Sequence, residues 1–150
     1  MGNKIIIGMT GPFGSGCTYI AKSILEKMGY KYISLSDILR DEFKQGESPS
    51  RTELQDYGNK VRRDCGADFL AKKAYEKIEE STEEKWVIDS IRNTHEITYL
   101  REVIGTFYVI AVWADQEMRW GRVAEKYNRN RLTFEGVSYN GYFRFMEVLR

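Results

Sequence analysis

Several residue types are scarce in this chain of 150 residues, and each shortage excludes a class of site. A single histidine, His95, excludes a metal site built from several histidines. The two cysteines, Cys17 and Cys65, lie far apart in the sequence, which argues against a disulfide framework and favours a reducing, cytoplasmic location. No apolar run is long enough to span a membrane.

The net charge of the chain is also close to zero. The sequence has 23 basic and 22 acidic side chains, a formal net charge of +1, and therefore no global field that would attract DNA or anionic lipid. We expect no nucleic-acid partner and no membrane partner, and any anion site must be local. With 42% hydrophobic residues the composition is that of an ordinary globular protein, so we expect one domain over residues 1–150.

Short apolar runs alternate with segments of helical periodicity along the chain. The predicted strands are 4–10, 30–35, 85–90 and 106–115. The predicted helices are 18–28, 36–45, 51–63, 67–80, 94–103 and 116–127. Because connections of helical length separate the strands, the strands should pair in parallel in a layered α/β sheet, with ligands at their carboxyl ends. We expect strand 4–10 to be central, with Ile5, Ile6 and Ile7 buried on both faces.

The stretch GPFGSGCT, at the junction of the first strand and first helix, nearly reads G-x-x-x-x-G-K-[ST]. Its glycines allow a tight turn, and successive N–H groups together with the helix end attract phosphate. The predicted phosphate-binding residues are Gly11, Gly14, Ser15, Gly16, Cys17 and Thr18. Thr18 would offer its hydroxyl to Mg²⁺. Tyr19 stands where a dinucleotide-binding loop needs a third glycine, which argues against a nicotinamide cofactor.

Cys17 occupies the position of the loop lysine. A neutral thiol supplies no charge, and losing a charge-assisted hydrogen bond costs about 1.5–3 kcal/mol in binding. Losing one preorganised donor typically slows a reaction by about 10² to 10³. Lys22 and Lys4 are poorly placed as replacements, because one lies down the helix and the other starts the strand at the wrong end. We therefore expect phosphate binding with weak or altered turnover.

Four further segments carry patterns that belong with such a loop: ISLSDILRDE (33–42), SRTELQDYGNKVRR (50–63), VIDSIRN (87–93) and MRWGRVAEKYNRNR (118–131). With them, most of the chain resembles the P-loop nucleoside monophosphate kinase group, which includes adenylate kinase, cytidylate kinase and dephospho-CoA kinase. The resemblance implies a three-layer α/β P-loop fold with strand order 2-3-1-4. It also implies ATP as phosphoryl donor, Mg²⁺ as cofactor and a monophosphate-type nucleotide as acceptor.

The resemblance also assigns roles to individual residues. Thr18 and Asp89 would hold Mg²⁺. The residues that would bind the acceptor are Asp37, Arg40, Gln55 and Arg92. The arginines that would neutralise the transferring phosphoryl group are Arg92, Arg119, Arg122 and Arg129, with Arg131 beside them. All but the first lie in a segment, about 116–133, that resembles the lid of these kinases.

Two functions remain open at this point. One is an ATP-dependent nucleotide kinase. The other is a non-catalytic nucleotide-sensing domain, because a loop with cysteine for lysine is similar to that of kinase-like domains fused to deoxycytidylate deaminases. A third alternative is a protein-interaction domain on a kinase scaffold. Thr18, Asp89, Arg40 and Arg92 favour the kinase over this third alternative, whereas Cys17 favours the sensing domain over the kinase.

The carboxyl-terminal part of the sequence leaves one strand exposed. The kinases that the chain resembles add a fifth parallel strand after the lid, whereas residues 137–150 have a helical pattern here. Strand 106–115 would then lie at the sheet edge with unpaired N–H and C=O groups, which proteins usually cover. We expect a second copy of the chain, the terminal segment or a fused carboxyl-terminal domain to cover this edge.

Overall fold

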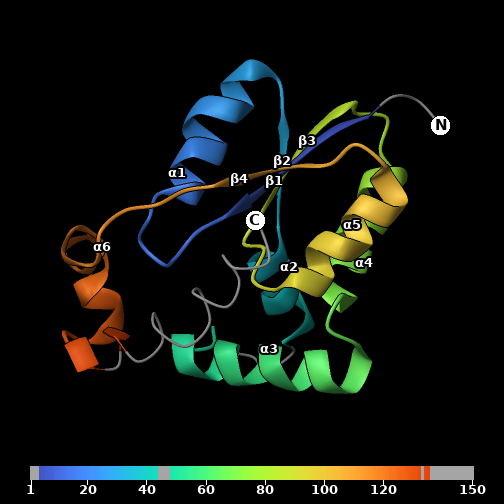
Figure 1. The fold of residues 1–150 in the computed structure, drawn as a ribbon. Helices are drawn as coiled ribbons and strands as arrows, with labels where there is room; N and C mark the ends of the chain where they lie inside the picture. The colour runs from blue at the N-terminus through green and yellow to red at the C-terminus, as the bar shows by residue number, and fades with distance from the viewer. Residues whose placement is uncertain (1–3, 44–47, 133, 136–150) are drawn as a thin grey trace.

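The computed structural model of the chain describes residues 4–43, 48–132 and 134–135. Its strands are β1 (Ile5–Thr10), β2 (Lys31–Ser34), β3 (Lys85–Asp89) and β4 (Tyr108–Ala111). They form one parallel sheet in the order β2-β3-β1-β4, which confirms the predicted pairing and order (Figure 1). Among the described residues the sheet has four strands, as expected.

Helical segments join the strands. They are α1 (Cys17–Ile20), which continues through a π-helical turn (Ala21–Leu25) and a 3₁₀ turn (Glu26–Met28), α2 (Leu35–Glu42), α3 (Arg51–Cys65), α4 (Phe69–Glu79), α5 (Thr94–Ile104), α6 (Gln116–Val123) and a 3₁₀ turn, η3 (Ala124–Tyr127). The predicted capping box opens α3, because Ser50 and Glu53 each accept a hydrogen bond from the other's backbone N–H. Asp115 caps α6 as predicted.

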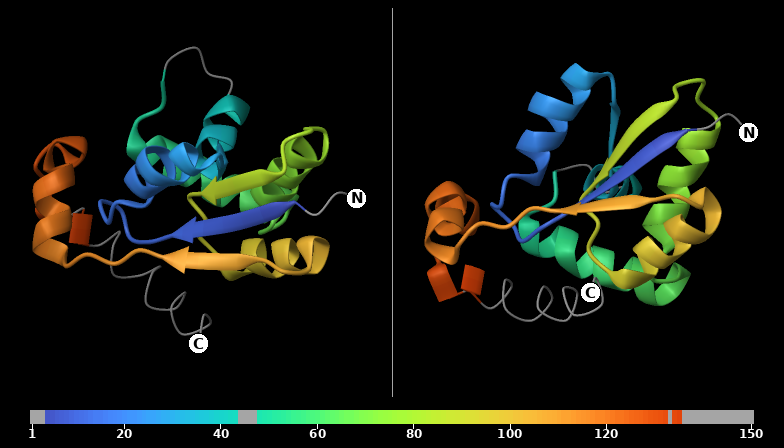
Figure 2. Two further views of the ribbon diagram at one scale, coloured as in Figure 1. Left: turned by 90° about the horizontal axis from the view of Figure 1, so that it is seen from above. Right: turned by 45° about the horizontal axis from the view of Figure 1, so that its top comes forward.

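Helices cover the two faces of the sheet unequally. Ile6 and Ile88 face a large core that α2, α3, α4 and α5 close. Met9 and Val87 face the opposite side, where Leu25 of the first helical segment packs on them. Figure 2 shows this arrangement, with α1 on one side of the strands and α3 to α5 on the other. The result is the expected three-layer fold, with the carboxyl ends of β1 and β3 opening toward α3.

One expectation about burial is wrong, and one strand is shorter than predicted. Ile6 is buried and Ile7 is partly buried, but Ile5, at the amino end of β1, is 48% exposed. Strand β4 is shorter than predicted and pairs only with β1 among the described residues. Tyr108 of this strand is 66% exposed and Ile110 is also exposed, so β4 lacks the two-sided cover of a central strand.

The covering of the β4 edge stays a prediction, because residues 136–150, including the expected terminal helix, lie outside the described residues. None of the helices in the described ranges has the length and apolarity needed to cross a bilayer.

Candidate functional site

The phosphate loop leaves the carboxyl end of β1 and enters α1. Gly14 and Gly16 have positive φ angles, 85° and 104°, which glycine adopts without strain. A Cβ at Gly11 would lie 2.4 Å from the carbonyl oxygen of Val112 and 2.5 Å from Oγ of Ser15, so this position also needs glycine. The three predicted loop glycines are therefore each required by the geometry of the backbone.

The loop borders a cavity of about 230 Å³, here called the donor cavity. The six predicted phosphate-binding residues all line it, as do Asp89, Arg92, Arg122 and Lys126. The Ser15 N–H donates to the Pro12 carbonyl (3.0 Å), so this group is used inside the loop. Helix α1 starts at Cys17, and of its N–H groups that of Ile20 donates to the Gly16 carbonyl (3.0 Å), while those before it in the first turn are suited to an anion.

The two predicted metal ligands lie together. Thr18 Oγ1 donates to Asp89 Oδ2 (2.8 Å), and the Tyr32 hydroxyl donates to the same oxygen (2.8 Å). The Ser90 N–H donates to Asp89 Oδ1 (2.7 Å), and the aspartate is only 1% exposed. Burial and the neighbouring carboxylate raise the pKa of Tyr32, so its hydroxyl stays protonated.

This oxygen-rich group fits Mg²⁺. That ion takes oxygen ligands, and in nucleotide sites one or two carboxylates usually suffice because phosphates and waters complete the shell. Thr18 and Asp89 would hold it beside the donor cavity, and Tyr32 would orient the carboxylate. No group of three or more His, Cys, Asp or Glu side chains suited to a metal occurs in the described part of the chain.

Cys17 places no charge in the loop. Its Sγ lies 3.5 Å from the Ser15 hydroxyl, and the side chain packs on the small core of Met9, Ala21, Leu25 and Val87. Burial is the largest cause that raises the pKa of the thiol, so it is neutral at ordinary pH.

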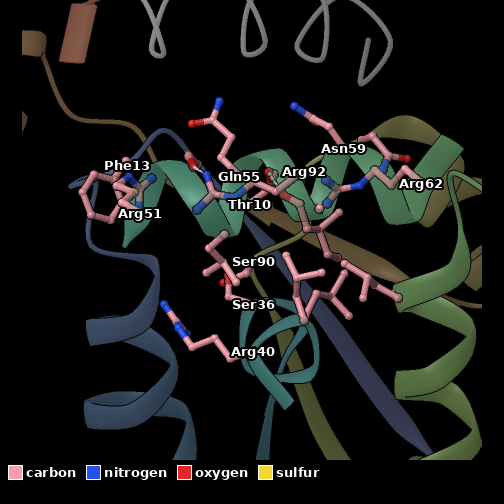
Figure 3. A pocket seen from close by; sticks show the side chains of 18 of the residues that line it. Thr10, Phe13, Ser36, Arg40, Arg51, Gln55, Asn59, Arg62, Ser90 and Arg92 are labelled. Carbon is pink, nitrogen blue, oxygen red and sulfur yellow. Dashed lines mark hydrogen bonds between the residues drawn. The ribbon is translucent and has the colours of Figure 1, made fainter. Parts of the chain in front are cut away.

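A second cavity, of about 360 Å³ and here called the acceptor cavity, lies between α2, α3 and the ends of β1 and β3. Arg40, Gln55 and Arg92, three of the four predicted acceptor-binding residues, line it (Figure 3). Asp37, the fourth, pairs with Arg40 (2.7 Å) on an exposed surface and is not among the lining residues.

Sequence reasoning missed part of this cavity. Helix α3 contributes Arg51, Gln55, Asn59 and Arg62, whose spacing of three or four residues puts them on one helix face. This spacing is visible in the sequence and could have indicated a polar helix face that lines a site. Figure 3 shows Arg51 beside Phe13 at one end of α3 and Arg62 toward the other end. None of the lining residues that the structure describes is an aspartate or glutamate, so the cavity suits an anionic ligand.

A buried carboxylate holds Arg92 in place. Glu96 is fully buried, and its Oε2 accepts the N–H groups of Arg92 (2.8 Å) and Asn93 (3.2 Å). Its Oε1 accepts a hydrogen bond from Arg62 Nη2 (3.3 Å). Burial raises the pKa of Glu96, and Arg62 opposes that shift. The Arg92 side chain donates to the Gly11 carbonyl (3.2 Å), at the boundary of the two cavities.

The structure separates the arginines of the segment that resembles a lid. Arg122 Nη1 donates to the carbonyls of Gly14 (2.9 Å) and Ser15 (3.3 Å), so this residue lies on the loop. Arg119 is buried and donates to the carbonyls of Ala114 (3.0 Å) and Phe13 (3.4 Å), which ties α6 to the loop backbone.

The other two arginines of this segment point elsewhere. Arg129 pairs with Glu125, and Arg131 pairs with Glu117 and with Glu135. Neither arginine is among the described residues that line the two cavities.

Residues 10–135 match the family model described as an AAA domain. The chain belongs to this AAA domain family. The matched range contains the phosphate loop from Gly11, both cavities and α6. The protein is therefore a P-loop nucleotide-binding domain of kinase-like fold.

This AAA domain is similar to curated proteins called UPF0200 protein. It is 34% identical over 125 residues to one from Methanothermobacter thermautotrophicus, covering 83% of this chain and 63% of the relative. It is 31% identical over 122 residues to one from Methanothrix thermoacetophila, covering 81% of this chain and 65% of the relative. The chain thus spans less than two thirds of the length of these relatives.

Solved structures show the same fold. The AAA domain is similar to TT1252 from Thermus thermophilus, with 19% identity, a TM-score of 0.50 and coverage of 92% of this chain and 85% of the other. An uncharacterized protein from Eubacterium ventriosum gives 20% identity, a TM-score of 0.50 and coverage of 90% and 69%. At these identities the similarity shows the fold alone.

Proposed function

We propose that this domain is an ATP-dependent phosphotransferase of the cytoplasm that acts on a nucleotide-like acceptor. The observation that carries the proposal is that the donor and acceptor cavities share a wall. The shared residues are Thr10, Gly11, Pro12, Phe13, Ser90, Ile91 and Arg92. Two ligands bound in contiguous cavities can bring a donor phosphoryl group and an acceptor oxygen into line, which direct transfer requires.

The residues of the two cavities suggest how the transfer proceeds. N–H groups at the start of α1 bind the donor phosphates, and Thr18 and Asp89 would hold Mg²⁺ beside them. The ion supplies positive charge to the donor phosphates when bound. An acceptor phosphate oxygen attacks the γ-phosphorus of ATP, the bond from that phosphorus to the bridging oxygen breaks, and ADP leaves. Arg92, at the boundary, stabilises the charge on the transferring group.

The acceptor cavity supports a small anionic substrate with a planar or polar part. Arg40 and Arg92 both line the cavity and suit its phosphate, since guanidinium groups bind phosphate through paired hydrogen bonds. Gln55 and Asn59 present amides that can read the donor and acceptor groups of a base.

A nucleotide-sensing domain is the second candidate, and the neutral, packed Cys17 favours it. In that case the loop binds nucleotide, no phosphoryl group is transferred, and a fused or partner domain responds. The phosphotransferase and the sensing domain would share the same fold and cavities. Only an assay of phosphoryl transfer therefore distinguishes them.

The test is phosphoryl transfer by the purified protein with Mg²⁺, radiolabelled ATP and a panel of nucleoside monophosphates. We expect labelled diphosphate from at least one acceptor, at a slow rate. Arg92→Ala should reduce this rate by about 10² or more, since it removes a donor at the transferring group. Arg101→Ala, an exposed arginine of α5, is the matched control. Nucleotide binding without any labelled product would favour the sensing domain instead.

A further inference from the structure

The donor cavity receives positive charge from an unexpected place. Its charged lining residues are Asp89, Arg92, Arg122 and Lys126. Two of the cations therefore come from α6 and η3, not from the loop or α1. The sequence analysis weighed Lys22, Lys4 and the arginines as substitutes for the missing loop lysine, and it did not consider Lys126.

Arg122 is already engaged with the loop itself. Its Nη1 donates to the carbonyls of Gly14 and Ser15, and its Nη2 to the sulfur of Met118 (3.1 Å). These bonds orient the guanidinium toward backbone carbonyls, so the side chain holds α6 against the loop. Arg122 is therefore better described as a residue that positions this segment.

Lys126 differs in its surroundings. Its Nζ lies 5.4 Å from the centre of the Phe13 ring, and Phe13 belongs to the loop. No carboxylate in the described part of the chain pairs with this ammonium group. Contact with an aromatic face holds a cation without neutralising it, so Lys126 brings a full charge to the cavity.

The remaining candidates are held elsewhere. Lys22 Nζ lies over the Tyr32 ring at 4.6 Å and is not among the lining residues. Lys4 Nζ donates to the carbonyls of Ile78 and Ser81, at the opposite end of β1. The sequence expectation that neither replaces the loop lysine agrees with these contacts.

We infer that Lys126 binds the outer phosphates of the donor nucleotide and supplies the positive charge that Cys17 does not. The inference rests on the proposed function in one respect, that a nucleoside triphosphate occupies the donor cavity. It assigns the loop's missing cation to the segment after α6, so the phosphate site is complete only when that segment lies against the loop.

The experiment measures affinity for ATP and for AMP with Mg²⁺, by titration calorimetry. Lys126→Gln should weaken ATP binding about tenfold and leave AMP binding unchanged. Tenfold is the low end of the effect of losing a charge-assisted hydrogen bond, and we expect the low end because the Lys126 side chain is exposed. Lys126→Arg should retain affinity. Lys27→Gln removes another exposed lysine, one that lines neither cavity, and is the control.

A second pair of variants tests whether the two positions serve the same phosphates. In the Lys126→Gln background, Cys17→Lys should recover ATP affinity relative to Cys17→Met, a neutral side chain of comparable length. Equal affinity of these double variants, or an ATP affinity of Lys126→Gln equal to that of Lys27→Gln, would overturn the inference. If the unmodified protein binds no ATP, the proposed function and the inference both fail. If it binds ATP and Lys126→Gln does not weaken that binding, only the inference fails.

Discussion

Replacing Glu96 tests whether the buried network under Arg92 holds the acceptor cavity together. Its carboxylate accepts hydrogen bonds from the Arg62 guanidinium and from the N–H groups of Arg92 and Asn93. Glu96→Ala leaves all three donors without this acceptor. Removing one member of a buried ion pair costs about 3–5 kcal/mol. Because whole domains are stable by about 5–15 kcal/mol, this is a large fraction of the total.

Urea denaturation followed by circular dichroism measures this loss. Glu96→Ala should lower the urea midpoint at constant slope, which corresponds to a loss of about 3–5 kcal/mol in the free energy of unfolding. Glu96→Gln keeps one acceptor oxygen and should lose only about 1–3 kcal/mol. Glu102→Ala, an exposed glutamate of the same helix, should stay within about 0.5 kcal/mol of the original. A midpoint for Glu96→Ala equal to that of Glu102→Ala would refute the reasoning.

Three further outcomes are expected. Asp89→Asn should abolish the enhancement of ATP binding by Mg²⁺, as titrations with and without the ion would show; an unchanged enhancement would place the ion elsewhere. Gly11→Ala should lower the stability of the domain by about 1–3 kcal/mol in a thermal melt, because the new Cβ would lie 2.4 Å from the Val112 carbonyl oxygen. Gly121→Ala in α6 is the control: its Cβ meets nothing within 4 Å, so it should not destabilise the domain. The outer edge of β4 should be protected from amide exchange by a partner or another segment; rapid exchange in a monomer would contradict this.

The local features of the site were predictable from the sequence because neighbouring residues determine them. Glycine spacing predicts the loop, and a serine three residues before a glutamate predicts the start of α3. The meeting of Thr18 with Asp89 required more than local pattern. It was expected from the family resemblance, and in the structure it arises because the parallel strands β1 and β3 end side by side.

Features that depend on tertiary surroundings were not predictable. A polar face on α3 has the same pattern whether it faces solvent or a cavity, so Arg51 and Arg62 were overlooked. The sequence likewise cannot show that Arg119 is buried among backbone carbonyls while Arg129 pairs with a neighbouring glutamate on the surface. The exposure of Ile5 has the same cause, since an apolar side chain is covered only if another segment reaches it.

The close packing of Gly11 against Val112 links the sheet edge to nucleotide binding. Val112 follows the last residue of β4, its N–H donates to the Thr10 carbonyl (2.8 Å), and its own carbonyl leaves no space for a side chain on Gly11. A chain that pairs along the outer edge of β4 would set the position of Val112, and through it the first turn of the phosphate loop. Assembly at the edge and affinity for nucleotide would then be thermodynamically linked, each strengthening or weakening the other by the same factor.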